Sequence, residues 1–315
     1  MSNRSMKVVP KSSLLKRLKG PVCMAAGFFD GVHAGHREIL RRAADRAKEL
    51  GGQAWVLTFD RHPLKVLCPE RAPRLLTSSA HKLDLLAGCG IDGCVMLSFS
   101  RDLAEQEPVE FVRRLLRDVP ALREVFVGMN WRFGRKASGN PALLRSLLAG
   151  SNASVNVVPA VRRGGRVISS SRIRAAVLAG KLNAAAQMLG RPFSVLGTVT
   201  HGHRVGRTIG FPTANLLCHG EVVPPCGVYA VRALVGGRMR NGVLNVGLRP
   251  TFSRPGSRKI SVELHLPGIR RNLYGRDIEV FFIRRLRGER RFSSPSALAA
   301  QIKRDIARAA AGGSR

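Results

Sequence analysis

Between residues 21 and 185, short apolar runs alternate with longer segments that repeat with the period of a helix. The apolar runs predict buried strands, and the segments between them predict amphipathic helices. Strand and helix in alternation form right-handed crossovers, so we expect a mostly parallel sheet that binds ligands at the carboxyl ends of its strands. The strands are expected over 22–26, 53–59, 93–99, 124–128 and 153–159, and the helices over 37–50, 79–90, 107–119 and 140–148.

The second part of the chain has a different pattern, in which short extended runs are separated by Gly, Pro and Asn. This spacing predicts a small antiparallel β-barrel, followed by a closing helix that Ser294 caps and that places Leu298, Ile302 and Ile306 on one face. The change of pattern predicts two domains, residues 1–186 and 187–315. The extended runs lie at 193–200, 227–236, 238–247, 259–266 and 277–285.

The net charge of the chain is +33, from 53 Lys and Arg against 20 Asp and Glu. A nucleic-acid binder or an enzyme for polyanionic substrates carries such a charge, and so does a chain whose excess arginines lie on solvated faces. No basic block or basic stripe interleaved with aromatic residues stands out, so nucleic acid stays open as a partner but is not favoured. No apolar run approaches the roughly 20 residues that span a bilayer, and we expect no membrane partner.

The six cysteines show no paired C-x-x-C arrangement, so a zinc site is not expected. Reduced thiols are the simpler interpretation, and they favour a cytoplasmic location. The first 29 residues are basic and contain no acidic residue, as in a transit segment. Because "PVCMAAGFF" leads directly into a glycine-rich turn, we interpret it as the first buried strand, preceded by a basic arm.

The segment "GFFDGVHAGH", residues 27–36, follows the first expected strand and contains two histidines and three glycines. At the start of the next helix, free backbone N–H groups and the helix dipole favour an anion, and histidines can donate to phosphate oxygens. The pattern H-x-G-H is neither a Walker loop nor a dinucleotide-binding turn, and it is typical of adenylyl-transferring enzymes. A turn that merely holds hydrogen-bonded histidines is the alternative.

Two further segments combine residue types suited to phosphate chemistry. "ISSSRIR", residues 168–174, places hydroxyls and arginines at a helix start, although an ordinary serine cap has the same appearance. "GRTIGFPTAN", residues 206–215, offers glycines for close backbone approach, with Thr213 and Asn215 as hard oxygen ligands suited to Mg²⁺. A turn with an Asn cap is the alternative for that segment.

The chain resembles the bacterial bifunctional riboflavin kinase/FAD synthetases over almost its whole length. "GFFDGVHAGH", "TFDRHP", "VGMNWRFG", "ASGN" and "ISSSRIR" are similar to the FAD synthetase motifs, in the family's order. "GRPFSVLGTVTHGHRVGRTIGFPTANL", "GVYAV", "NVGLRPTF", "VELHL", "LYG" and "LRGERRF" are similar to the riboflavin kinase motifs. The resemblance implies a Rossmann-like nucleotidyltransferase domain followed by a barrel-shaped riboflavin kinase domain.

The resemblance also implies site residues, with catalytic roles for His33, His36, Arg174 and Glu263. The nucleotide would contact Gly27, Phe29, Asp30, His33, Gly35, His36, Asn130, Ser170, Ser171, Gly206 and Gly210. Thr213 and Asn215 would bind Mg²⁺, and Glu263 would accept the proton of the riboflavin 5′-hydroxyl. In "SVELHL", Glu263 and His265 share a strand face opposite Val262 and Leu264, so only the family position singles out the glutamate.

By this resemblance the protein phosphorylates riboflavin to FMN with ATP and then adenylylates FMN to FAD, releasing pyrophosphate. Its partners would be riboflavin, FMN and ATP, and its oligomeric state is not assigned. Four positions depart from the family pattern without losing a functional group: Ser171, Arg61, Trp131 and Ile269. The alternatives are a chain with one active half, an adenylyltransferase for another phosphorylated metabolite, and a basic RNA-associated protein.

Overall fold

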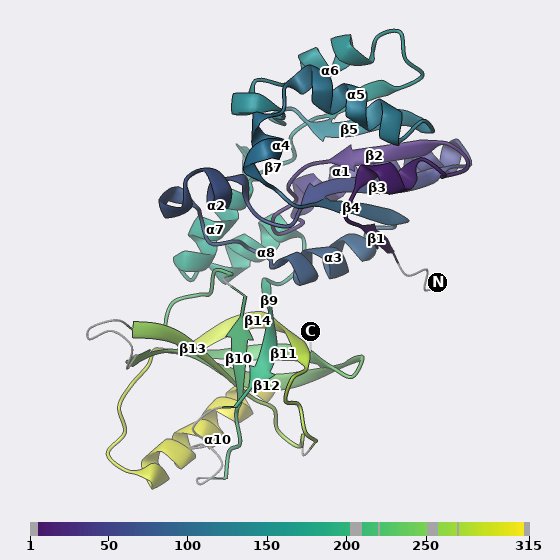
Figure 1. Cartoon of the computed structure of the whole chain (residues 1–315). Coiled ribbons are helices and arrows are strands. Elements are labelled where there is room, and N and C mark those ends of the chain that lie inside the picture. The colour runs from purple at the N-terminus through teal and green to yellow at the C-terminus, as the bar shows by residue number, and fades with distance from the viewer. Residues whose placement is uncertain (1–5, 202–209, 220, 251–257, 270, 312–315) are drawn as a thin grey trace. The chain divides into compact units, whose positions relative to one another are not determined.

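The computed structural model describes residues 6–201, 210–219, 221–250, 258–269 and 271–311 (Figure 1). These residues form two compact units. The first unit comprises residues 1–75 and 79–170, and the second comprises residues 76–78 and 171–315. The predicted division at 186/187 stays a prediction, because the compactness of a unit does not establish which piece of chain folds alone.

The first unit contains a six-stranded sheet in which every neighbouring pair of strands is parallel. Its order is β1-β4-β3-β2-β5-β6, which confirms the predicted parallel sheet. A short antiparallel pair, β7 and β8, lies outside this sheet. The bounds are β1 Lys7–Val9, β2 Val22–Ala26, β3 Gln53–Phe59, β4 Gly93–Leu97, β5 Leu122–Gly128, β6 Ser154–Val158, β7 Arg162–Arg163 and β8 Arg166–Val167.

Six helices connect these strands, and two apolar clusters cover the two faces of the sheet. One cluster contains Met24 and Trp55, and the other contains Cys23 and Leu40, as expected for strands whose successive side chains point to opposite faces. The Asn140 side chain accepts a hydrogen bond from Leu143 N–H at 2.9 Å, which confirms the predicted cap. The helices are α1 Ala34–Glu49, α2 Pro63–Leu67, α3 Ser79–Ala87, α4 Arg101–Glu105, α5 Pro108–Asp118 and α6 Pro141–Leu148.

The strand order reverses at β2, and this reversal decides where the unit can bind a ligand. From β2 the chain winds to β3 and β4 on one side, and it then returns to β5 and β6 on the other side. Connections that leave β2 and β5 in opposite directions open a crevice at the carboxyl ends of these two strands. The glycine-rich turn that follows β2 therefore lies at the crevice.

The N-terminal segment differs from its prediction as a basic arm. Lys7–Val9 forms β1, an edge strand parallel to β4, and a 3₁₀ turn follows at Ser12–Leu15. Val9 and Leu15 are buried, and the Ser12 hydroxyl donates to Asp118 Oδ2 at 2.7 Å. Because Lys7 and Lys11 are exposed, the sequence shows no clear strand pattern here. The strand β1 nevertheless supplies backbone hydrogen-bond partners to β4, which would otherwise be the exposed edge of the sheet.

The second unit contains a closed antiparallel barrel, in the order β10-β13-β12-β11-β14-β9. This arrangement confirms the predicted barrel, although β10 was not predicted as a strand. Among the described residues, no helix has both the length and the apolar character that a membrane crossing requires. The bounds are α7 Ser170–Leu178, α8 Leu182–Leu189, β9 Ser194–Thr200, β10 Ala214–Cys218, β11 Gly227–Val235, β12 Arg238–Pro250, β13 Arg258–His265, β14 Asp277–Arg287 and α10 Pro295–Ala311.

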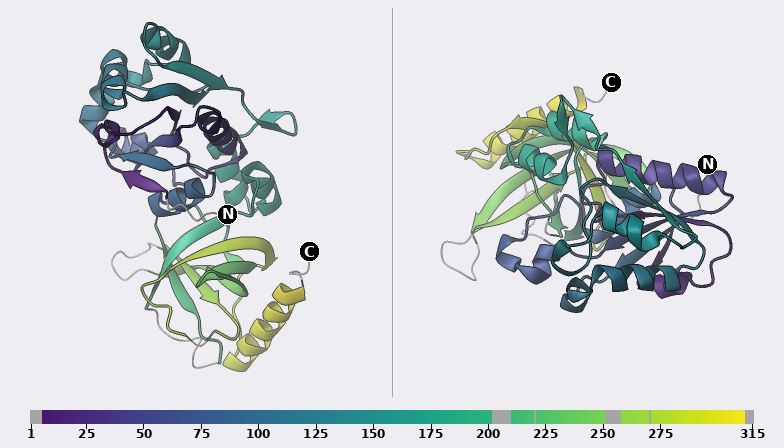
Figure 2. Two further views of the ribbon diagram at one scale, coloured as in Figure 1. Left: turned by 90° about the vertical axis from the view of Figure 1, so that its right-hand side faces the viewer. Right: turned by 90° about the horizontal axis from the view of Figure 1, so that it is seen from above.

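The closing helix α10 packs against β11, β12 and β14 (Figure 2). Ser294 Oγ accepts a hydrogen bond from Ala297 N–H at 3.2 Å, which confirms the cap. The predicted apolar face is only half-buried, and the helix's buried residues are the polar Gln301 and Asp305. Asp305, 1% exposed, accepts hydrogen bonds from Arg287 Nε at 2.9 Å and from Gln301 Nε2 at 2.8 Å.

We predict that Asp305→Ala destabilises the second unit by about 3–5 kcal/mol, because it leaves the Arg287 guanidinium without its buried counter-charge. Urea unfolding followed by circular dichroism measures this loss. Glu49→Ala is the control, because it removes a partner from the exposed Arg46–Glu49 pair and should change the unfolding midpoint little. Equal midpoints for the two variants would contradict a stabilising role for Asp305.

Candidate functional sites

The turn between β2 and α1 has an unusual backbone. Phe29 and Val32 adopt φ angles of 55° and 39°, which side-chain-bearing residues rarely populate, and Gly31 adopts 81°. Phe29 and Val32 are nevertheless 1% and 2% exposed, because they pack among the apolar side chains of α1 and the sheet. This packing holds a strained turn against the start of α1, as is common at functional sites.

His33 and His36 stack at the start of α1. Their ring centroids are 3.5 Å apart and their planes differ by 17°. His33 Nδ1 accepts a hydrogen bond from His36 N–H at 3.3 Å and so caps the helix. A Cβ on Gly35 would lie 3.3 Å from the His33 ring, so glycine suits this close approach. Both imidazoles therefore lie beside the free N–H groups of a helix start, where an anion is favoured.

His36 is held in its neutral form. Burial, followed by the neighbouring His33 and Lys82, lowers the pKa of His36 well below the usual value of 6.5. The His36 Nδ1 atom is buried and has no hydrogen-bond partner among the described residues. A buried polar atom without a partner is costly, so a polar ligand atom at this position would stabilise the turn.

Of two other predicted segments, one contacts the histidine turn, by which we mean residues 27–36, and the other follows the adjacent strand. The Ser170 hydroxyl donates to the Asp30 carbonyl at 3.0 Å, which connects the start of α7 with the turn. Asn130 is exposed in the bend that Trp131 N–H closes on Gly128 O, directly after β5. Because β5 pairs with β2, this bend and the histidine turn follow adjacent strands at the crevice.

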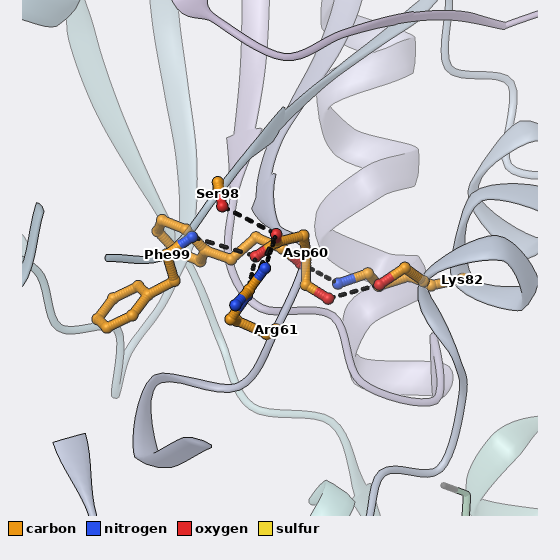
Figure 3. A network of polar contacts seen from close by, with 7 residues as sticks. Asp60, Arg61, Lys82, Ser98 and Phe99 are labelled. Atoms are coloured by element: carbon orange, nitrogen blue, oxygen red, sulfur yellow. Dashed lines mark hydrogen bonds and ion pairs between the residues drawn. The ribbon is translucent and has the colours of Figure 1, made fainter. Parts of the chain in front are cut away.

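A polar network joins the carboxyl ends of β3 and β4 (Figure 3). The Asp60 carboxylate accepts hydrogen bonds from Ser98 Oγ at 3.0 Å, from Phe99 N–H at 3.1 Å and from Arg61. Burial alone would raise the pKa of Asp60, but the hydrogen bonds from Arg61, Phe99 and Ser98 outweigh it and lower the pKa. Arg61 is one of the four positions that depart from the family pattern, and this arginine adds an ion pair with Asp60 to the network.

The register of the barrel brings three polar residues into one row. Glu263 on β13 lies directly opposite Asn215 on β10 and directly opposite Asn245 on β12. Residues directly opposite each other in antiparallel strands project to the same face, with Cβ atoms about 5 Å apart. The predicted base and one predicted metal ligand are therefore neighbours, and Asn245 joins them without having been predicted.

Thr213 lies where two cavities of the second unit meet, since it lines both of them. His265 fixes the adjoining backbone, because its Nδ1 lies 2.8 Å from Pro212 O and must donate to this carbonyl. Glu263 and His265 share a face, as predicted, but His265 is buried and the face lines a cavity under α10.

The first of these cavities has a volume of about 320 Å³ and combines apolar walls with a few polar groups. Ligand pockets commonly have this character. The apolar walls include Val228, Val243, Phe292, Leu298 and Ile302, and the polar groups include Thr213, Asn245, Glu263 and Arg287. The second cavity, of about 140 Å³, is lined by Thr213 together with Leu264, Ile269, Leu273 and Tyr274 among others.

A wider hollow of about 870 Å³ in the first unit contains none of the predicted residues. Its lining pairs basic with acidic side chains, so it offers no excess positive charge for a triphosphate. The basic residues are Lys11, Lys16, Arg114 and Arg117, and the acidic residues are Asp102, Glu105, Glu110 and Asp118. We therefore place the candidate phosphate site at the crevice instead of in this hollow.

The predicted site residues thus form two groups. In the first unit, the histidine turn contains Gly27, Phe29, Asp30, His33, Gly35 and His36, Ser170 donates to it, and Asn130 follows the adjacent strand. The barrel gathers Thr213, Asn215 and Glu263. Ser171 and Arg174 follow on α7 in the second unit, where Ser171 is exposed and Arg174 is half-buried. Gly210 is exposed before β10, and Gly206 lies outside the described residues.

Comparison with known protein families divides the chain in the same order. Residues 15–172 match the model of the FAD synthetase family, and residues 189–312 match that of the riboflavin kinase family. The two matches leave only short segments of the chain uncovered.

Several curated relatives align along nearly the whole chain. The bifunctional riboflavin kinase/FMN adenylyltransferase of Bacillus subtilis is 34% identical over 93% of this chain and 92% of its own length. Its namesake in Escherichia coli K12 is 37% identical over 90% of each chain. A crystal structure titled as a macrolide-efflux protein from Streptococcus pneumoniae has a TM-score of 0.81 at 28% identity, over 95% of this chain and 97% of that one.

We predict that the neutral state of His36 makes the stability of the first unit depend on pH. The unfolded chain takes up a proton at His36 near pH 6.5, whereas the folded chain resists it, so this contribution is present above pH 6.5 and is lost as the pH falls below that value. The slope is at most about 1.4 kcal/mol per pH unit. Urea unfolding at pH 7.0 and 5.5 should show a smaller loss for His36→Gln than for the natural chain, and equal losses would contradict a neutral His36.

Proposed function

The chain belongs to the family of bifunctional riboflavin kinase/FMN adenylyltransferases and catalyses both reactions, and on that premise we propose how its residues divide the work. One reaction phosphorylates riboflavin to FMN, and the other adenylylates FMN to FAD. We assign adenylyl transfer to the crevice of the first unit and phosphoryl transfer to the barrel of the second. Each assignment rests on the local geometry and not on how the units are placed.

The stacked pair His33 and His36 at the start of α1 carries the proposal for adenylyl transfer. The FMN phosphate attacks the α-phosphorus of ATP, and pyrophosphate leaves. Negative charge grows on the phosphoryl oxygens, and donors already fixed in place stabilise it most effectively. A neutral His36 donates one N–H to such an oxygen without first releasing bound solvent, and the free N–H groups of α1 add to it.

Around the histidines, other residues bind the nucleotide. Asn130 lies at the adjacent strand end and suits the adenosine part of ATP, which a carboxamide can recognise by hydrogen bonds. Ser170 already contacts the turn through Asp30. Ser171 and Arg174 directly follow Ser170 in the motif "ISSSRIR", and only this motif supports a role for them in binding phosphate.

Phosphoryl transfer is proposed at the row of Asn215, Glu263 and Asn245. Glu263 accepts the proton of the riboflavin 5′-hydroxyl as the oxygen attacks the γ-phosphorus of ATP, and ADP leaves. The apolar cavity under α10 suits the flavin ring, because it has room for an aromatic ligand and opens onto Glu263. Thr213 lines both this cavity and the neighbouring one. The phosphoryl group would therefore move past Thr213 on its way from ATP to riboflavin.

The donor set at this row fits Mg²⁺. The Thr213 hydroxyl and the Asn215 carboxamide oxygen are hard ligands, and Asn215 lies directly opposite Glu263. Mg²⁺ is commonly held by few protein oxygens and completed by water and substrate phosphates, and when bound it neutralises phosphate charge. The hydrogen bond from His265 to Pro212 O steadies the backbone next to Thr213, which orients this ligand.

The remaining proposals concern location and partners. All six cysteines carry free thiols, which fits a reducing compartment such as the cytoplasm. Riboflavin, FMN and ATP account for both sites, so no nucleic acid is required as a partner. The net charge of +33 has no specific ligand in this proposal.

We predict that His36→Ala abolishes FAD formation while FMN accumulates from riboflavin and ATP. Removing one donor to the transition state costs about 10²–10³ in rate. Chromatography of the flavin products measures both reactions in one sample, so the kinase activity is an internal control for an intact chain. Equal loss of both products in a folded variant would contradict the division into two sites.

We predict the opposite outcome for Glu263→Gln, which should stop riboflavin phosphorylation because an amide cannot accept the hydroxyl proton. FMN supplied directly bypasses the first reaction, so this variant should still convert FMN to FAD. The assay compares FAD formed from riboflavin with FAD formed from FMN. A kinase rate near that of the natural chain would remove Glu263 from the mechanism.

A further inference from the structure

Lys82, on α3, is a buried cation that the proposed mechanism does not use. It is 2% exposed, and its ammonium donates to Phe59 O at 2.6 Å and to Phe28 O at 3.2 Å, with Thr58 Oγ1 at 3.4 Å. Figure 3 shows Lys82 beside the polar network of Asp60. The ammonium also lies 4.5 Å from the centre of the Phe28 ring. Lysine is almost never buried unless its charge is paired, yet these contacts go to carbonyls, a hydroxyl and a ring.

The contacts of Lys82 fall where β2 and β3 end. Phe28 O is the carbonyl immediately before Phe29, the first residue of the histidine turn with a left-handed φ. The Thr58 hydroxyl donates to the same carbonyl at 3.0 Å. A strained conformation persists only when its surroundings hold it, and these two donors hold the turn at its first strained residue.

Residues of α3 therefore form hydrogen bonds with the ends of both β2 and β3. The Ser79 hydroxyl donates to Asp60 O, one residue beyond the Phe59 carbonyl that Lys82 holds. Asp60 in turn binds the segment after β4 through Ser98 and Phe99. The histidine turn is thus connected through Lys82 to the strand ends on its β3 side.

The charge of Lys82 is not neutralised by a direct ion pair among the described residues. The groups that face it are Asp30 after β2, Asp60 after β3, Cys94 on β4 and His36 on α1. Burial lowers the pKa of Lys82 to about 8, although Asp30, Cys94 and Asp60 act to raise it. Burial raises the pKa of Cys94 to about 12, so this thiol stays neutral. Below about pH 8 the ammonium therefore keeps its proton, with Asp30 and Asp60 as the acidic residues that act on it.

We propose that Lys82 is a positioning residue for adenylyl transfer, whose ammonium fixes the carbonyls at the ends of β2 and β3 and places positive charge behind the turn that receives the ATP phosphates. The proposal rests on the assignment of the histidine turn to ATP. It requires no contact between Lys82 and the substrate. The ammonium acts through the backbone of Phe28 and through its field.

Two kinetic consequences follow for the natural chain. As the pH rises through about 8, free enzyme loses the ammonium proton, so kcat/KM for ATP in FAD formation should decline. Bound triphosphate favours the charged form, so kcat should decline only at a higher pH. Deprotonation also ends the cost of burying a charge, so the contribution of Lys82 to folding stability rises with pH between about 8 and its usual value of 10.5. A merely structural lysine would not lower activity where it stabilises the fold.

The experiment compares the full-length chain with Lys82→Met and with Thr58→Val, assayed for FAD formation from FMN and ATP between pH 6.5 and 9.5. Thr58→Val is the matched control, because it removes the other donor to Phe28 O without changing charge. We expect Lys82→Met to lower kcat about 10²-fold, as a displaced reacting group does, and to abolish the decline of kcat/KM above pH 8. We expect Thr58→Val to lower kcat less than tenfold and to keep that decline.

Lys82→Met that melts like the natural chain and keeps kcat within threefold would overturn the proposal. If this variant does not fold, the pH profile of the natural chain decides, and a flat kcat/KM between pH 7 and 9.5 would overturn it. His36→Ala separates a failure of the role proposed for Lys82 from a failure of the assignment of the histidine turn to ATP. Loss of FAD formation in His36→Ala but not in Lys82→Met refutes only the role of Lys82, whereas activity in both refutes the assignment of the turn to ATP.

Discussion

The pairing of β2 with β3 on one side and β5 on the other is the constraint on which the first site depends. Because the connections that follow β2 and β5 leave in opposite directions, the topology places a ligand crevice between the carboxyl ends of these two strands. The turn after β2 then meets two requirements at once, since it buries Phe29 and Val32 and begins α1, whose first backbone N–H groups lack partners within the helix. The strain at these two residues is the local cost of that position, and packing and donors from neighbouring strand ends offset it.

The barrel also brings polar residues from separate strands together, but it does so through strand register. In antiparallel strands, residues that lie opposite each other share a face, so the register alone brings Asn215, Glu263 and Asn245 together. The helix α10 then closes the apolar side of the cavity. Its attachment depends on Asp305 and Arg287, an ion pair whose loss would leave one buried charge unpaired. In both units, the polar groups of the site are held by the elements that build the core.

Much of this architecture could be predicted from the sequence, because the pattern and the motifs agree. Runs such as "QAWVLTF" are buried strands over the predicted residues, and the two parts with different patterns form a parallel sheet and a barrel. The order of the motifs predicted the two activities. The charge and composition alone did not distinguish a nucleic-acid-binding protein from an enzyme that acts on polyanionic substrates. The division of roles among the histidines, Glu263 and the α7 residues stays a prediction that the variants above test.

The features that escaped prediction are polar residues whose partners are distant in the chain. From the sequence, Lys82 is expected to be a solvent-exposed lysine on a helix. In the structure, its ammonium donates to the carbonyls of Phe28 and Phe59. Asp305 likewise falls within the predicted apolar side of α10, and only the position of Arg287 explains its burial. β1 was missed because its lysine lies in a basic segment, although Val9 is buried against the sheet. Sequence periodicity reports which face is apolar, but it does not report which buried polar group will find a partner.

We propose that one chain performs two different transfers from ATP at two separately built sites. Labelled ATP tests it most directly. The purified chain is incubated with riboflavin, Mg²⁺ and ATP that carries ³²P either at the γ or at the α position, and FMN and FAD are then separated. We expect the γ-label in both FMN and FAD, whereas the α-label should enter FAD alone. Alpha-label in FMN, or FAD formed without it, would contradict the account.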